Sequence, residues 1–260
     1  MTKNILLKIE NISSGYGSTI IVNNFSFEVQ KGQVLVITGS NGMGKTTLMK
    51  TIMGLIEARN GTIIFKDEDI TNSSPDYRSK LGIGYVPQGR EIFSALSVEQ
   101  NIMLPIYTRK KNSLNIKDKL EEIYSLFPIL KEKRFANGSS LSGGQQQQLA
   151  IARALIFDPE IIILDEPAEG IQPSIVTFIG ETLLDLSKNS KKTFIVVEQN
   201  ISLISQLNSD CILVEKGISP NRIRTMTFGE DRPADPNLTE TAYRLNRRGE
   251  FVLLTPKPGT

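Results

Sequence analysis

Apolar runs of strand length alternate along this 260-residue chain with segments whose apolar residues recur at helical spacing. The predicted buried strands cover residues 34–38, 61–65, 83–86, 161–165, 194–197 and 211–214. The predicted helices cover residues 46–54, 97–103, 117–127, 146–157 and 174–186. Strands that alternate with helices are typical of a mostly parallel sheet. The pattern therefore predicts an α/β fold.

Near the N-terminus, apolar and polar residues alternate one by one, at residues 5–10 and 25–29. This period is that of a strand with one buried face. Turns at residues 14–18 and 30–33 separate these strands and lead to the first core strand. We expect an antiparallel β flank ahead of the parallel core. Tyr16, in the first turn, could stack on an adenine ring or simply pack on the sheet edge.

The strand at 34–38 runs into a glycine-rich loop of the form Gly-x4-Gly-Lys-Thr, and a helix follows. This strand–loop–helix context is the one that a phosphate-binding P-loop requires. Its glycines let the loop N–H groups converge on phosphate oxygens. Lys45 would supply a charge to the β- and γ-phosphates, and the Thr46 hydroxyl would ligate Mg²⁺. The residues predicted to bind the nucleotide are Gly39, Ser40, Asn41, Gly42, Met43, Gly44, Lys45, Thr46 and Thr47.

Two adjacent acids, Asp165 and Glu166, end the apolar run at 161–165. Alone they would indicate a solvated turn, but downstream of a P-loop they are typical of a nucleotide-hydrolysing site. Asp165 could hold Mg²⁺, usually through water. Because successive strand residues face opposite ways, Glu166 would face the γ-phosphate and polarise an attacking water.

A serine and two glycines lead directly into the helix predicted at 146–157. A helix N-terminus attracts anions through its free N–H groups and its dipole. The helix tip and the P-loop of one chain cannot easily contact the same triphosphate. We therefore expect the tip to bind the γ-phosphate of a nucleotide that another protomer holds. A plain capped helix is the alternative. The residues of this second candidate phosphate site are Ser142, Gly143, Gly144 and Gln145.

Composition narrows the function classes. Thirty basic and twenty-eight acidic side chains give a net charge of +2, a balance that argues against nucleic acid as a partner. The absence of histidine excludes His-based triads and His metal sites. Cys211 lies among apolar residues and is predicted to be a buried strand residue rather than a reactive thiol. With no secretory leader and no run long enough to span a membrane, we expect a cytoplasmic protein.

In their combination and order, these motifs resemble those of the ATP-binding cassette (ABC) ATPases. The matching pieces are Tyr16, the loop at 39–47, Gln88, and residues 141–145 and 161–166. The resemblance implies a cassette at residues 1–217, with a helical subdomain inserted at about 89–158. It also implies head-to-tail pairing with a second ATPase subunit around ATP. Gln88 would then be the loop glutamine that contacts Mg²⁺ and the attacking water and relays their state to a membrane partner.

Three glutamines depart from the family's pattern. Gln199 stands where most members carry a histidine, Gln148 where an arginine commonly follows the signature, and Gln172 where the loop joining the protomers usually has an aspartate. The changes at Gln199 and Gln172 are similar to those of ATPase subunits of branched-chain amino acid and urea importers. The sequence around these positions looks closest to the urea branch. A glutamine can hydrogen-bond a γ-phosphate but cannot hold a proton, which leaves Glu166 as the base.

The resemblance predicts the ATP-hydrolysing, energy-coupling subunit of an importer for urea or for branched-chain or polar amino acids, bound peripherally at the inner face of the cell membrane. The permease would be a separate chain, the ATPase dimer a homodimer or a heterodimer, and an external substrate-binding protein an indirect partner. The alternatives are a regulatory cassette and a soluble ABC ATPase acting on nucleic acid or ribosomes. The predicted catalytic residues are Glu166, Gln199 and Gln88, and the predicted Mg²⁺ ligands are Thr46, Gln88 and Asp165.

The resemblance thins over residues 218–260, which we expect to form an accessory segment. Residues 222–228 and 250–254 are strand-like, and three arginines between them form a small basic cluster. A solvated hairpin or helix is the simplest expectation, and regulatory or lipid-facing use is the alternative.

Overall fold

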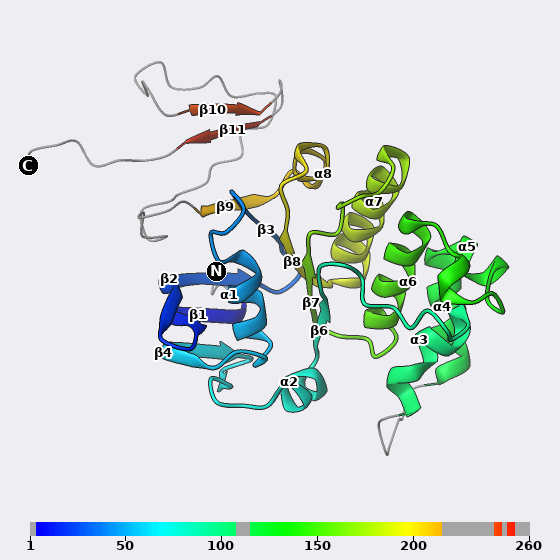
Figure 1. Cartoon of the computed structure of the whole chain (residues 1–260), viewed down its shortest axis with the longest axis horizontal. Coiled ribbons are helices and arrows are strands. Elements are labelled where there is room, and N and C mark those ends of the chain that lie inside the picture. Colours follow the sequence, from blue (N-terminus) through cyan, green and yellow to red (C-terminus); the bar gives the residue numbers. More distant parts are fainter. Residues whose placement is uncertain (1–3, 108–114, 215–241, 246–248, 253–260) are drawn as a thin grey trace, which may run out of the picture.

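A five-stranded parallel sheet forms the centre of the protein and contains five of the six strands that the alternating pattern predicts (Figure 1). The prediction is wrong for the strand at 61–65, which pairs antiparallel with an N-terminal strand outside this sheet. The structure is a computed structural model that describes residues 4–107, 115–214, 242–245 and 249–252. The strands lie in the order β6-β7-β8-β3-β9, and every neighbouring pair is parallel. Their bounds are β3 Val34–Gly39, β6 Ile83–Val86, β7 Ile161–Asp165, β8 Thr193–Val197 and β9 Asp210–Val214.

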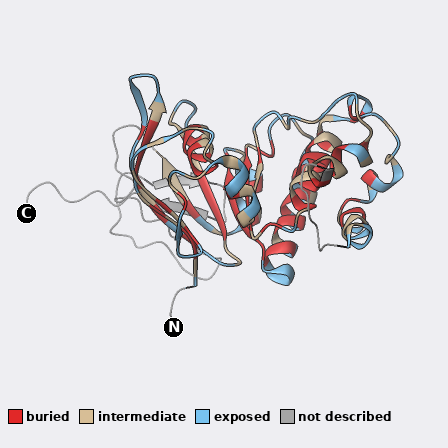
Figure 2. Cartoon of the chain, turned by 90° about the horizontal axis from the view of Figure 1, so that it is seen from below, coloured by how far each residue is buried: buried red, intermediate tan, exposed pale blue. Residues whose placement is uncertain are grey.

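Each central strand divides its apolar side chains between two cores, one on each face of the sheet. In β7, Ile162 and Leu164 pack into the core that contains residues of α3–α8, whereas Ile161 and Ile163 pack into the core that contains α1 and the antiparallel strands. The same alternation holds in β3 and β8. Burial on both faces explains why these strands are continuous apolar runs (Figure 2).

The expected antiparallel flank is present and has the strand order β2-β1-β4-β5. Its strands are β1 Ile5–Tyr16, β2 Thr19–Gln30, β4 Ala58–Phe65 and β5 Glu68–Asp69. The turn expected at residues 14–18 is wrong in extent, because β1 continues to Tyr16, which pairs with Thr19. Register shifts between Ile9 and Gly15 allow this continuation, and they include Asn11 in the left-handed region (φ 51°).

The helices of residues 98–155 lie together, away from α1 and the antiparallel strands (Figure 1). The helices are α1 Lys45–Ile52, α2 Pro75–Leu81, α3 Val98–Tyr107, α4 Ile116–Leu126, α5 Pro128–Glu132, α6 Gly143–Leu155, α7 Pro173–Ser190 and α8 Ile201–Leu207, with a 3-10 turn at Gly138–Ser140. This arrangement matches the helical insertion expected at about 89–158, although the domain division itself stays a prediction.

A buried arginine fixes the C-terminal end of α1, the helix that follows the glycine-rich loop. Arg78 is 2% exposed, and its guanidinium donates to the carbonyl oxygens of Thr51 and Ile52 at 2.8 and 2.7 Å. It also donates to the carbonyls of Thr71 and Ser73. A cation at a helix C-terminus interacts favourably with the helix dipole. Arg78 thus holds α1 against the α2 segment.

Near the C-terminus, β10 Ala242–Leu245 and β11 Gly249–Val252 form an antiparallel pair. The predicted strand at 250–254 overlaps β11, whereas the one at 222–228 lies outside the described residues. Within the described part of the chain, no helix is both long and apolar enough to cross a membrane.

Candidate functional site: a nucleotide-binding edge of the sheet

The glycine-rich loop connects the end of β3 to the start of α1, and two of its glycines are required by geometry. Gly39 has φ 146°, and a Cβ there would lie 2.2 Å from the carbonyl oxygen of Val214. Gly44 has φ 86° at the N-cap of α1, where a Cβ would lie 2.9 Å from a methyl carbon of Ile21. The loop therefore depends on glycine to pass close to its neighbours and to aim the first-turn N–H groups of α1 inward.

Lys45 is the first residue of α1, and its side chain folds back under the loop. Its Nζ donates to the carbonyl oxygens of Gly39 and Ser40 at 2.6 and 2.9 Å, and the residue is 5% exposed. Burial lowers the pKa of Lys45, an effect that the nearby carboxylates of Glu166 and Asp165 oppose. A buried cation beside first-turn N–H groups is suited to hold an anion.

Asp165, the last residue of β7, faces α1 from a buried position. Strand alternation puts it on the same face as Ile161 and Ile163, and it is 1% exposed. Burial raises its pKa to about 6, although hydrogen bonding by the Thr46 hydroxyl opposes this rise. The Tyr85 hydroxyl lies 3.5 Å from Oδ2, while Oδ1 has no hydrogen-bond partner. A buried carboxylate with a vacant oxygen beside a threonine hydroxyl fits a hard divalent cation.

Glu166 follows in a left-handed backbone conformation (φ 50°), with its carboxylate between two glutamine amides. Gln88 Nε2 donates to Oε2 at 3.0 Å, and Gln199 Nε2 donates to Oε1 at 2.9 Å. The Gln199 amide also lies 2.6 Å from Oδ1 of Asn41 in the glycine-rich loop. Gln88 in addition donates to Glu169 at 3.1 Å. The three residues predicted to be catalytic therefore meet at one point, although they come from segments far apart in the sequence.

The second candidate phosphate site is the N-terminus of α6. Ser142 is its N-cap and forms a capping box with Gln145. Gln145 Oε1 also accepts a hydrogen bond from Lys133 Nζ at 3.3 Å, and Gly143 lies beside the guanidinium of Arg90. The local contacts of this tip are the same for a plain capped helix and for a surface that binds phosphate in trans.

The remaining predicted residues occupy distinct places. Tyr16 ends β1 and is 50% exposed, whereas Thr47 and Gln148 are buried in α1 and α6. Gln172 is the N-cap of α7. Of the residues predicted to bind the nucleotide, those between the end of β3 and the start of α1 are Ser40, Asn41, Gly42, Met43 and Gly44.

Sequence reasoning missed four residues that touch this site. Tyr85 contacts Asp165, Glu169 contacts Gln88, Arg90 Nη2 donates to the Glu169 carbonyl, and Glu198 hydrogen-bonds the loops after β7 and β8. For Glu198 the sequence carried a signal of burial, because the carboxylate directly follows a fully apolar strand, but no signal of its backbone partners.

A glycine-rich loop between β3 and α1, with an acid at the end of β7, a core strand separated from β3 by β8 alone, defines a P-loop nucleotide hydrolase. A protein-family model described as "ABC transporter" matches residues 22–169. The chain therefore belongs to the ABC transporter ATPase family.

Curated relatives cover most of the chain. A branched-chain amino acid transport ATP-binding protein of Pseudomonas aeruginosa is 33% identical over 82% of this chain and 90% of its own length. A probable branched-chain amino acid transport ATP-binding protein of Archaeoglobus fulgidus is 32% identical over 82% and 89%. A lipopolysaccharide export ATP-binding protein of Haemophilus influenzae is 34% identical over 75% and 81%.

Solved structures give the same result for the fold. A nucleotide-free ATP-binding cassette from an ABC transporter superposes with a TM-score of 0.72 at 27% identity, over 82% of this chain and 88% of that one. A dimeric cassette in a post-hydrolysis state, bound to ADP and Pi, gives 0.72 at 25% identity over 82% and 95%. The predicted fold class and family are confirmed. The protein is an ATP-binding, ATP-hydrolysing, energy-coupling ABC subunit, of a kind that forms dimers and works with membrane permeases.

Proposed function

We propose that this chain is the energy-coupling ATPase of an importer and works at the inner face of the cell membrane with a separate permease. The observation that carries the proposal is the meeting of Gln88, Glu166 and Gln199 beside the glycine-rich loop. ATP binding would close a pair of such subunits, and hydrolysis would open it. The permease would follow these two states, since a ligand shifts an equilibrium towards the state that it binds better.

Lys45 and the first-turn N–H groups of α1 would hold the phosphates of ATP. Thr46, Asp165 and Gln88 would hold Mg²⁺, which when bound neutralises phosphate charge and orients the reacting groups. Within the described residues no three acidic or cysteine side chains form a metal cluster. Mg²⁺ is usually bound by one or two carboxylates together with phosphates and waters, and Asp165 would supply the carboxylate here.

Glu166 would act as the general base for the attacking water. Gln199 would hydrogen-bond the γ-phosphate, since its amide already spans from Glu166 to Asn41 of the glycine-rich loop. An amide cannot take the proton from water, so proton transfer falls to Glu166 alone. In this structure Gln88 and Gln199 each donate one hydrogen bond to the Glu166 carboxylate, which leaves a further acceptor position on each oxygen for the attacking water.

A second subunit would complete the site. Ser142 and the first turn of α6 would contact the γ-phosphate bound by the partner, and Gln172 would lie in the loop between the protomers. The half-exposed ring of Tyr16 is free to stack on the adenine. The solved dimeric cassette bound to ADP and Pi is consistent with such pairing.

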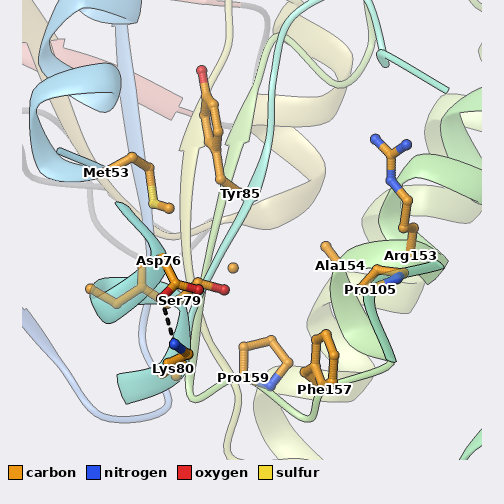
Figure 3. A pocket seen from close by; sticks show the side chains of 13 residues that line it. Met53, Asp76, Ser79, Lys80, Tyr85, Pro105, Arg153, Ala154, Phe157 and Pro159 are labelled. Atoms are coloured by element: carbon orange, nitrogen blue, oxygen red, sulfur yellow. Dashed lines mark hydrogen bonds and ion pairs between the residues drawn. The ribbon is translucent and has the colours of Figure 1, made fainter. Parts of the chain in front are cut away.

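A pocket of about 310 Å³ beside β6, the strand that precedes Gln88 in the chain, is the proposed docking place for the permease. It is lined by side chains of α2, β6, α3 and α6, among them Lys80, Tyr85, Pro105 and Arg153 (Figure 3). Tyr85 connects this pocket to the nucleotide site, because its hydroxyl also approaches Asp165. A permease segment seated here would therefore sense the occupancy of the nucleotide site.

We propose branched-chain amino acids as the substrate class, with urea as the alternative. Relatives named for branched-chain amino acid transport support the first, and Gln199 and Gln172 suit both. A lipopolysaccharide exporter subunit of similar identity shows that identity alone does not fix the cargo. The discriminating assay reconstitutes the tagged chain, purified with its permease from native membranes, and compares uptake of labelled leucine and urea.

The ATPase proposal is tested with the purified chain and Mg²⁺-ATP. We expect hydrolysis by the wild type, and ATP-dependent dimers of Glu166→Gln by light scattering. Ser142→Arg should abolish those dimers while each monomer still binds ATP. The matched control, Glu160→Gln, lies at the opposite end of the sheet and should leave both readouts unchanged. Hydrolysis stimulated by nucleic acid or ribosomes but not by the permease would overturn the importer assignment in favour of a soluble ABC ATPase.

A further inference from the structure

Glu198 is a buried carboxylate that the proposed chemistry leaves without a role. It directly follows β8 and is 3% exposed. Its Oε2 accepts the backbone N–H of Ala168 at 2.9 Å. Its Oε1 accepts the backbone N–H groups of Gln199 and Asn200 at 2.7 and 2.8 Å. One carboxylate thus joins the loop after β7 to the loop after β8.

The backbone around Glu198 adds a third connection. Its own N–H donates to the carbonyl of Ile37 in β3 at 3.0 Å, beside the glycine-rich loop. Asn200, whose N–H it accepts, caps α8 by accepting the N–H of Leu203. The residue therefore sits where the glycine-rich loop, the Glu166 loop and the Gln199 loop come together.

Burial of a carboxylate is costly unless hydrogen bonds offset it. Burial raises the pKa of Glu198, whereas the three backbone N–H groups favour its charged form. Three donors shared by two oxygens make a geometry that a neutral amide cannot reproduce. A glutamine there would turn its NH₂ group towards at least one N–H donor.

We propose that Glu198 is a positioning residue for ATP hydrolysis. By tying Ala168 to Gln199, it keeps the Glu166 carboxylate within hydrogen-bond reach of the Gln199 amide. This proposal rests on the roles proposed above for Glu166 and Gln199. Small displacements of reacting groups are enough to slow catalysis strongly.

The test is Glu198→Gln, which preserves size and reach. We expect kcat for ATP hydrolysis to fall about 10- to 100-fold with KM for ATP unchanged, because the phosphate-binding loop is untouched. Hydrogen exchange should show lost protection at the amides of Ala168, Gln199 and Asn200. The matched control is Glu160→Gln, a carboxylate before β7 held by Lys31 and Lys66, and it should leave kcat unchanged.

Two further variants separate positioning from stability. In a Gln199→Ala background, Glu198→Gln should cost less in kcat than it does in the wild type, because residues that act through each other are non-additive. If Glu198→Gln does not fold, Glu198→Asp serves instead, since its shorter side chain cannot reach both loops. An unchanged kcat despite lost amide protection, or full additivity with Gln199→Ala, would overturn the positioning role. A wild type without ATPase activity, or a fully active Glu166→Gln, would instead overturn the proposed function.

Discussion

The polar side chains at the two ends of the central parallel sheet differ in how fully they are paired. Before β7 and β8, at the amino ends of the strands, charged groups are paired. Oδ1 of Asp158 forms ion pairs with Lys119 Nζ at 2.7 Å and with Lys192 Nζ at 2.9 Å. The carboxylate of Glu160 pairs with Lys31 and Lys66. These groups are satisfied in the folded chain without any ligand.

At the carboxyl ends of the same strands the polar groups are left incomplete. Within the described part of the chain, Asp165 has a buried oxygen without a hydrogen-bond partner, and Lys45 donates only to loop carbonyls. Buried polar groups are normally satisfied, so an edge that departs from this rule is arranged for a ligand.

The direction of the pKa shifts follows the same division. Burial raises the pKa of Asp165 to about 6, because its hydrogen bonds offset burial only in part. Burial acts the same way on Asp158, but hydrogen bonds from Lys119 and Lys192 more than offset it, and its pKa is lowered. The amino edge is therefore built for stability and the carboxyl edge for binding and catalysis.

The largest expected effect is a loss of catalytic rate without a loss of stability. Glu166→Gln should lower kcat by roughly 10²–10⁴-fold, the usual worth of a general base, because an amide cannot accept the proton. Thermal stability should not fall, since the amide can still hydrogen-bond its neighbours. Steady-state phosphate release and a thermal melt measure the two quantities. Wild-type turnover in this variant would show that the base lies elsewhere.

Next in size is the loss of the loop cation. Lys45→Met should weaken ATP binding by about 1.5–3 kcal/mol, or roughly 10- to 100-fold in Kd, because a charged hydrogen bond to phosphate disappears. Titration of a fluorescent ATP analogue by the purified variant measures Kd. Asp158→Asn, from the other end of the sheet, is the control and should bind the analogue like the wild type. Equal affinities for Lys45→Met and wild type would contradict the proposed phosphate contact.

The sequence predicted the carboxyl edge better than the rest of the molecule. Strand alternation predicted the orientation of Asp165, and the glycine spacing located Lys45. Glu166 lies after the end of β7 in a left-handed conformation, so the strand period does not set its direction. Both signals are local, and residue types and spacing carry them. The short helices α2 and α8 were missed, although Ser74 and Asn200 supply their N-caps, because each contains too few residues for a clear period.

Interactions between loops were beyond sequence reasoning for a different reason. Glu198 binds backbone N–H groups, one of them 30 residues away, and a backbone donor leaves no trace in a side-chain pattern. The same holds for Arg78, which binds four carbonyls and no acidic side chain. Only the folded chain brings these partners together.

A smaller effect is expected at the amino edge. Asp158→Asn should lower stability by about 1 kcal/mol or less, because the paired carboxylate is partly exposed, which corresponds to ~2 °C in Tm. Because the pKa of Asp158 is lower in the folded state, its charge stabilises the folded state at pH values above the unfolded pKa of 3.8. This stabilisation is lost as the pH falls through the folded-state pKa. The Tm gap between wild type and variant should therefore be present at neutral pH and close in acid. A gap that persists in acid would show that charge is not its cause.

The smallest expected effect is a very low reactivity of the Cys211 thiol in the native protein. Cys211 lies in β9 opposite Val36 of β3. Burial raises the pKa of this thiol to about 12, and the charge of Asp210 adds to the rise. Because only the thiolate attacks disulfide reagents, the native protein should react very slowly with an aromatic disulfide at pH 8, and the urea-unfolded chain at once. Fast labelling of the native state would mean that β9 detaches from β3. That result would weaken the difference between the amino and carboxyl ends of the sheet, since the strand that borders Gly39 of the phosphate loop would then itself be mobile.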